Sequence, residues 1–106
     1  MALSRILSHE GHDVSTASNG QEALGQLRIR DFELVITDIN MPEMDGLTFL
    51  RELKRSYPQI DVIMITAYGE VESYLEAMGL GALEYINKPV NYGDLKKIIN
   101  KVFKIV

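Results

Sequence analysis

Three polar residues of different chemistry, Asp38, Thr66 and Lys88, each stand at or just after the end of a run of apolar or β-branched residues. If those runs are neighbouring parallel strands, a carboxylate, a hydroxyl and an amine converge at the sheet edge where open α/β folds bind ligands. Side chains on three successive strand ends can meet at one point. Each residue also has a structural interpretation: Asp38 as a turn residue, Thr66 as a helix cap and Lys88 as a solvated loop residue.

The strands that must position these side chains follow from the hydrophobic pattern. Four short runs predict strands, at residues 14–17, 34–37, 62–66 and 84–86. The two middle runs are apolar on successive residues, which is typical of strands that are covered on both faces.

Apolar residues spaced three to four positions apart predict five helices around these strands. The stripes are Leu3, Ile6 and Leu7; Ala23, Leu24 and Leu27; Leu47, Phe49, Leu50 and Leu53; Val71, Tyr74, Leu75 and Met78; and Leu95, Ile98, Ile99, Val102 and Phe103. Strict alternation of helices and strands with short connections predicts right-handed crossovers and a parallel sheet. The expected fold class is therefore α/β, a three-layer α/β/α sandwich with four strands and five helices.

Length and composition exclude several classes of protein. The chain has 106 residues, which suits one domain, and 46% of them are hydrophobic, enough for a packed core. The absence of cysteine excludes disulfide scaffolds and thiol chemistry. No apolar run approaches the ~20 residues that cross a bilayer, and no export signal opens the chain, so we expect a cytoplasmic protein. The net charge of −4 argues against direct binding of nucleic acid.

Three ordered motifs resemble those of bacterial two-component response-regulator receiver domains. Residues 38–46, DINMPEMDG, are similar to the phospho-acceptor segment of that family, and residues 66–69, TAYG, and 82–89, ALEYINKP, match its next two signatures. The similarity covers essentially all of residues 1–106 and implies a flavodoxin-like, chemotaxis-regulator-like fold. The residues of the TAYG motif most resemble those found in receivers of transcriptional activators of the nitrogen-regulator type.

The resemblance implies a role in a phosphorelay, as a signalling module rather than an enzyme. Asp38 would accept a phosphoryl group from a histidine kinase or a phosphotransfer protein. Lys88 would neutralise one phosphoryl oxygen, the Thr66 hydroxyl would donate to another, and Ala67 would leave the approach open while offering its backbone N–H. The family also has a cis peptide bond at the position of Lys88–Pro89.

The resemblance further implies a switch made of Thr66 and Tyr85. If Thr66 moves toward a phosphorylated Asp38, it vacates space that Tyr85 can enter, which shifts the population between two packings. The last two helices and the last strand would then present an altered surface to an output domain. An ordinary core role for Tyr85 is the alternative.

One element of the family is missing from this sequence. Receivers open with an apolar central strand that ends in two acidic residues, whereas residues 1–7, MALSRIL, match the later part of the first helix. In the family those acids hold Mg²⁺ together with the acceptor. Here Asp38 and the main-chain carbonyl of Asn40 remain as ligands, so we expect weak or absent Mg²⁺ binding and impaired phosphorylation.

The missing strand also leaves the predicted strands at residues 14–17 and 34–37 without a shared partner. Bare strand edges favour pairing with another chain. We therefore expect direct pairing of these two strands, a strand lent by another molecule, or self-association to a dimer through the sheet edge. The alternative function is thus a phosphorylation-independent interaction or dimerisation module with a receiver-like fold.

Overall fold

A computed structural model describes residues 2–39, 44–67 and 71–103 of the chain. Over these residues the chain forms five helices and three strands. Their order is α1 (Ala2–His9), α2 (Gly20–Ile29), β1 (Leu34–Asp38), α3 (Gly46–Ser56), β2 (Asp61–Thr66), α4 (Val71–Gly79), β3 (Glu84–Asn87) and α5 (Tyr92–Val102). No helix within these ranges combines the length and the apolar character needed to cross a membrane.

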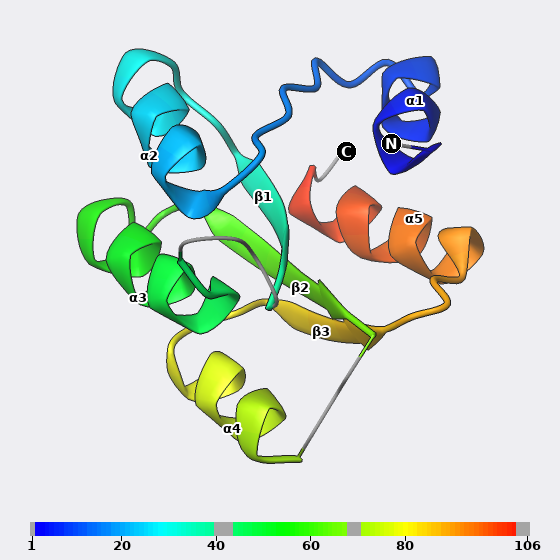
Figure 1. Cartoon of the computed structure of the whole chain (residues 1–106). Helices are drawn as coiled ribbons and strands as arrows, with labels where there is room; N and C mark the ends of the chain where they lie inside the picture. Colours follow the sequence, from blue (N-terminus) through cyan, green and yellow to red (C-terminus); the bar gives the residue numbers. More distant parts are fainter. Residues whose placement is uncertain (1, 40–43, 68–70, 104–106) are drawn as a thin grey trace.

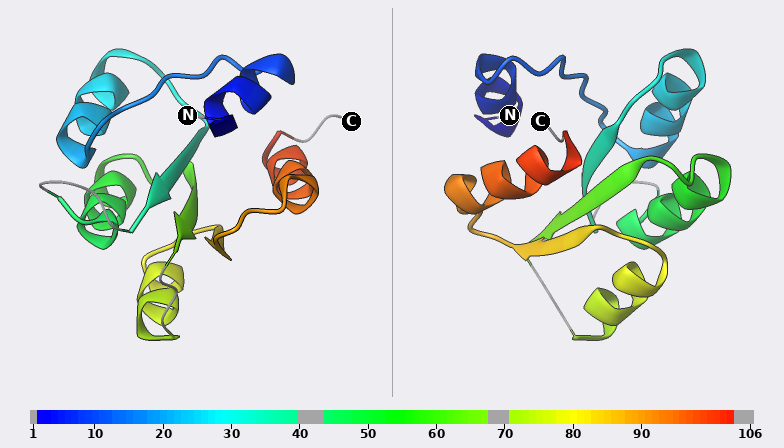
Figure 2. Two further views of the ribbon diagram at one scale, coloured as in Figure 1. Left: turned by 45° about the vertical axis from the view of Figure 1, so that its right-hand side comes forward. Right: turned by 180° about the vertical axis from the view of Figure 1, so that it is seen from behind.

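The three strands form one parallel sheet in the order β1-β2-β3. Helices α1 and α5 lie on one face of this sheet, and α2, α3 and α4 lie on the other (Figure 1 and Figure 2). The expected α/β class and three-layer arrangement are confirmed.

The central strand β2 is buried on both faces and divides the core in two. Val62 and Met64 pack in one cluster with residues of α2, α3 and α4. Ile63 and Ile65 pack in a second cluster with residues of α1 and α5. Because successive side chains of a strand point to opposite faces, an unbroken apolar run serves both layers. The prediction of a strand covered on both faces, made from the continuous apolar run, is therefore confirmed.

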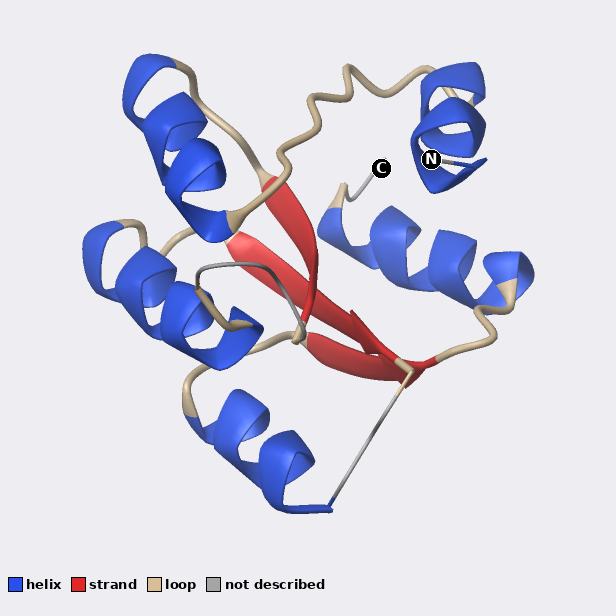
Figure 3. Ribbon diagram, viewed as in Figure 1, coloured by secondary structure: helices blue, strands red, loops and turns tan. Residues whose placement is uncertain are grey.

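The expected strand at residues 14–17 is wrong, and the sheet has three strands among the described residues instead of four. This segment runs as a loop between α1 and α2 (Figure 3). Side chains of α2 and of its C-cap residue hold it: Gln26 donates to the carbonyl of Thr16 at 2.8 Å, and Arg30 donates to Ser15 Oγ at 3.2 Å. A short β-prone run without a neighbouring strand forms no ladder, because its backbone groups find no strand partner.

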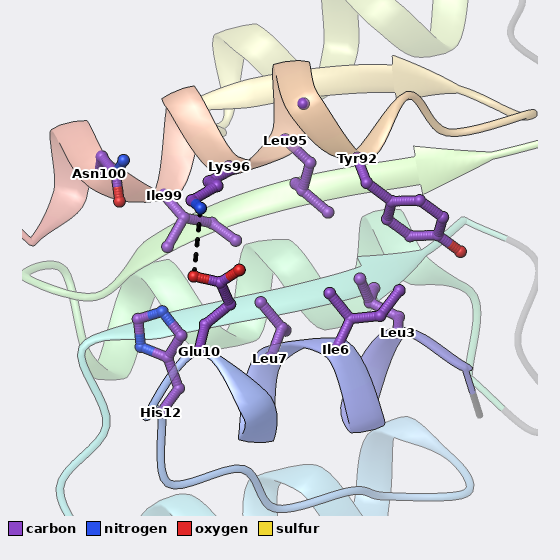
Figure 4. A pocket seen from close by; sticks show the side chains of 11 residues that line it. Leu3, Ile6, Leu7, Glu10, His12, Tyr92, Leu95, Lys96, Ile99 and Asn100 are labelled. Carbon is purple, nitrogen blue, oxygen red and sulfur yellow. Dashed lines mark ion pairs between the residues drawn. The ribbon is translucent and has the colours of Figure 1, made fainter.

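The first helix packs on the last one. Leu3 shares a cluster with Leu95 and Ile99, and Lys96 forms an ion pair with Glu10 at 3.3 Å at one end of the contact (Figure 4). A groove of about 190 Å³ lies between the two helices. Helix α1 is thus part of the same folded unit as the sheet.

Gly46 allows α3 to begin directly beneath the end of β1. Its N–H donates to the carbonyl of Ile39 at 2.6 Å, and a Cβ at this position would collide with the backbone oxygen of Asp38. The close approach requires glycine because backbone atoms, unlike a flexible side chain, cannot move aside locally.

Replacing Gly46 with alanine therefore tests how tightly this junction is packed. We expect Gly46→Ala to lower the free energy of unfolding by about 1–3 kcal/mol, as overpacking does. The matched control is Gly25→Ala in the interior of α2, where a Cβ meets nothing within 4 Å. That change should raise the free energy of unfolding by about 0.5–1 kcal/mol. Urea denaturation measures both, and equal effects of the two substitutions would contradict the packing assigned to Gly46.

Candidate functional site

The strand register brings the ends of all three strands to one edge of the sheet. Asp38, the last residue of β1, pairs with Ile65 of β2. Thr66, the last residue of β2, pairs with Asn87 of β3, and Lys88 follows directly. Residues that close neighbouring parallel strands thus stand within one position of each other across the sheet, as the sequence predicted.

Asp38 and Lys88 are in direct contact. The Lys88 Nζ donates to Asp38 Oδ2 at 3.0 Å, although 50 residues separate them in the chain. The Asp38 side chain is 30% exposed and that of Lys88 is 49% exposed. An exposed pair of this kind contributes at most about 1 kcal/mol to stability. The pair therefore contributes little to the stability of the fold, and its carboxylate is accessible from solvent.

Thr66 is joined to Lys88 through the backbone. The N–H of Lys88 donates to the carbonyl of Thr66 at 2.8 Å. The Thr66 side chain is fully buried, and no buried polar side-chain atom among the described residues lacks a hydrogen-bond partner. Ala67 follows and is exposed, so a small residue borders the solvent side of the site. The cis peptide bond expected at Lys88–Pro89 is present.

Of the two expected Mg²⁺ ligands, Asp38 alone lies in the part of the chain that the structure describes. Asn40 lies outside the described residues, and Asp38 is paired with Lys88. The Asp45 carboxylate caps α3 by accepting from the N–H and the hydroxyl of Thr48. Asp61 opens β2 at the opposite end of the sheet. No group of three or more His, Cys, Asp or Glu residues capable of holding a metal occurs in the described ranges.

Tyr85 lies on β3 and contacts α4. Its hydroxyl forms a hydrogen bond with Ser73 Oγ at 2.8 Å. Its ring meets that of Tyr74 edge to face, with centroids 5.5 Å apart and an interplanar angle of 89°. Tyr85 is partly buried against the cluster that includes Met64 and Ala77. It is therefore neither a free surface residue nor a fully enclosed core residue.

Ser73 is the contact residue that sequence reasoning missed. It stands four positions before Ala77, the fully buried residue of α4, so both lie on the inner face of that helix. A small hydroxyl residue on the inner face of an amphipathic helix signals a hydrogen-bond partner in the adjacent layer, because buried polar groups are rarely left unpaired. The partner itself could not be identified from spacing alone.

Comparison with known proteins identifies the relatives of this chain. The transcriptional regulatory protein ZraR of Escherichia coli O157:H7 is 41% identical over 99 residues, which make up 93% of this chain and 22% of that protein. The chain thus spans about a fifth of the length of the curated relatives that it matches. These relatives are transcriptional response regulators of two-component systems.

Solved structures of similar domains share the fold. A CheY-like response regulator receiver domain protein from Methanospirillum hungatei JF-1 has a TM-score of 0.90 and 34% identity, covering 97% of this chain and 83% of that one. The receiver domain of NtrX from Brucella abortus has a TM-score of 0.90 and 32% identity, covering 99% of this chain and 89% of that one. The expected likeness to regulators of the nitrogen-regulator type is confirmed. The profile of the response regulator receiver domain matches residues 1–100, and the chain belongs to that family.

Proposed function

We propose that this chain receives a phosphoryl group on Asp38 from a phosphohistidine of a histidine kinase or a phosphotransfer protein. The observation that carries the proposal is the contact of Lys88 Nζ with Asp38 Oδ2 at 3.0 Å. It joins a solvent-accessible carboxylate to a fixed positive charge at the carboxyl edge of a parallel sheet, where such folds carry out their chemistry.

The residues at this edge suit phosphoryl transfer, which depends on positioning and on charge stabilisation more than on acid–base chemistry. An Asp38 oxygen attacks phosphorus, the P–N bond to the donor imidazole breaks, and an acyl phosphate forms. Lys88 would neutralise one phosphoryl oxygen. The Thr66 hydroxyl and the Ala67 backbone N–H would donate to the others. Because Ala67 is small and exposed, the donor has room to approach.

The transfer in this chain is proposed to be slow. Receiver domains of this family bind Mg²⁺ at the phosphorylation site. In the part of this chain that the structure describes, Asp38 is paired with Lys88, Asp45 caps a helix, and Asp61 lies at the opposite end of the sheet. Lys88 is then the charge that faces the incoming group. Its single positive charge stabilises a transferring phosphoryl group less than a lysine and a divalent cation do together.

The proposed output surface lies on α4, β3 and α5, as the resemblance implies. Helix α4 exposes large apolar side chains to solvent: Val71 is 74% exposed and Leu75 is 62% exposed. Exposed apolar side chains that cluster on one helix are typical of contact surfaces. A displacement of Tyr85, which touches α4 through Ser73, would change this surface and be sensed by an output domain.

Acetyl phosphate labelling tests the proposed acceptor. Incubation with acetyl phosphate should add one phosphoryl group to the chain, and Asp38→Asn should abolish the addition because an amide does not attack phosphorus. The matched control is Asp45→Asn, which keeps a good helix-capping side chain and leaves the acceptor intact. Intact-mass spectrometry measures the product, and peptide mapping locates it. Labelling that survives in Asp38→Asn would refute the assignment, as would its loss in Asp45→Asn alone.

A second candidate function, a receiver-like module that dimerises through the sheet edge, is favoured by the position of β1. Its one ladder among the described residues is with β2, although its Val35 and Ile36 pack into opposite clusters, as in a strand with neighbours on both sides. An edge strand with unpaired N–H and C=O groups and apolar side chains on both faces is a template for another strand. The proposed occupant is a second copy of this chain.

Edge pairing predicts dimers in which β1 is protected. Sedimentation velocity should show a concentration-dependent dimer, and hydrogen exchange of the β1 amides that do not bond to β2 should slow as the dimer forms. Strand β3 provides the internal control, because it ends the sheet on the other side and its exchange should not change. A monomer at all concentrations, or a dimer that leaves the β1 amides unprotected, would exclude this function.

A further inference from the structure

Helix α4 buries fewer of its residues than the neighbouring helix α3. Its single fully buried residue is Ala77, whereas α3 buries Phe49, Leu50 and Leu53. An element that buries little apolar surface opens at lower free energy than the core around it. The partly buried hydrogen bond to Tyr85 therefore contributes to fixing α4, beside the packing of Ala77 and the exposed ion pair of Glu76 with Arg51.

The contacts between α4 and Tyr85 come from consecutive helix residues. Ser73 Oγ and the Tyr85 hydroxyl are 2.8 Å apart, and the ring of Tyr74 meets that of Tyr85 edge to face. The hydrogen bond is partly buried, so water competes with it less than at the surface. The two contacts hold both the hydroxyl end and the ring of Tyr85.

Tyr85 is in turn tied to the acceptor edge by the sheet. It pairs with Met64 of β2, and three residues later the N–H of Lys88 bonds to the carbonyl of Thr66. If the Tyr85 side chain leaves its position on β3, it must either break its contacts with α4 or displace α4 as well. The same side chain cannot move freely while the Ser73 hydroxyl holds it.

We propose that Ser73 is a positioning residue whose hydroxyl latches Tyr85 to α4 and thereby couples this helix to β3. The latch holds Tyr85 in the packing seen in this structure. Its role in switching rests on the proposed function: the hydrogen bond opposes displacement of Tyr85 and so disfavours the phosphorylated arrangement. Loss of the hydroxyl from either residue removes this bond.

A double-mutant cycle of Ser73→Ala and Tyr85→Phe in the unmodified protein tests the latch. Each substitution should speed hydrogen exchange of the α4 amides by roughly two- to tenfold, the range that one hydrogen bond spans. The double variant should exchange no faster than the faster single variant. The cycle cancels the gain in helix propensity that alanine brings, since that gain is the same with Tyr85 or Phe at position 85. Effects that multiply in the double variant would overturn the latch.

Two further variants separate the latch from a general change in the protein. Ser73→Thr keeps the hydroxyl and should keep the exchange of α4 and the NMR signals of the Tyr85 ring close to those of the unchanged chain. Ser8→Ala, at an exposed serine of α1, should leave both unchanged. A Tyr85 ring signal that shifts equally in Ser8→Ala and Ser73→Ala would overturn the assignment to Ser73.

Labelling by acetyl phosphate then tests the link to the acceptor. Ser73→Ala and Tyr85→Phe should each raise the rate or extent of Asp38 labelling by roughly two- to tenfold, because the latch no longer opposes the modified arrangement. Equal labelling of all variants would overturn the role of the latch in switching. No labelling of any variant would overturn the proposed function, whereas the exchange cycle by itself decides whether Ser73 and Tyr85 are coupled.

Discussion

The rest of the structure depends on the burial of β2 on both faces. Its alternating side chains serve two separate clusters, one with α2, α3 and α4 and the other with α1 and α5. A shift of one position would exchange every side chain between these clusters, so the register with β1 and β3 is strongly specified. That register places Asp38, at the end of β1, and Lys88, just after β3, on either side of Thr66 at the end of β2.

The candidate site is therefore a consequence of core packing and not of interactions within the site. The Asp38–Lys88 pair is partly exposed and contributes little to stability, so it requires a scaffold that is rigid for other reasons. Gly46 belongs to this scaffold, because it lets the start of α3 touch the backbone of Asp38. By contrast, α4 buries little and carries the residues that touch Tyr85. A well-packed sheet edge that carries the proposed acceptor, beside a helix that buries little, suits a domain that converts a chemical change into a change of surface.

Periodicity predicted most of this arrangement, and its failures have physical causes. The runs at residues 34–37 and 62–66 are apolar on successive residues, and their helices carry clear stripes, so strands, helices and the convergence of Asp38 with Lys88 followed directly. The strand predicted at residues 14–17 was wrong because local β propensity does not supply a neighbouring strand, and Gln26 of α2 and the C-cap residue Arg30 hold that segment instead. The Ser73–Tyr85 bond depends on how α4 packs on the sheet, which no local pattern encodes. The roles of Asp38, Thr66, Ala67 and Lys88 in transfer stay predictions.

The most direct test of the account compares Lys88→Gln with Lys96→Gln. Both lysines form partly exposed ion pairs, Lys88 with Asp38 and Lys96 with Glu10, so both substitutions should change the free energy of unfolding by less than about 1 kcal/mol. The initial rate of Asp38 labelling by acetyl phosphate should fall by at least about tenfold in Lys88→Gln, because the developing negative charge loses its fixed partner, and should stay unchanged in Lys96→Gln. Equal labelling rates in the two variants would contradict the claim that the sheet register builds a phosphoryl-acceptor site around Asp38 and Lys88.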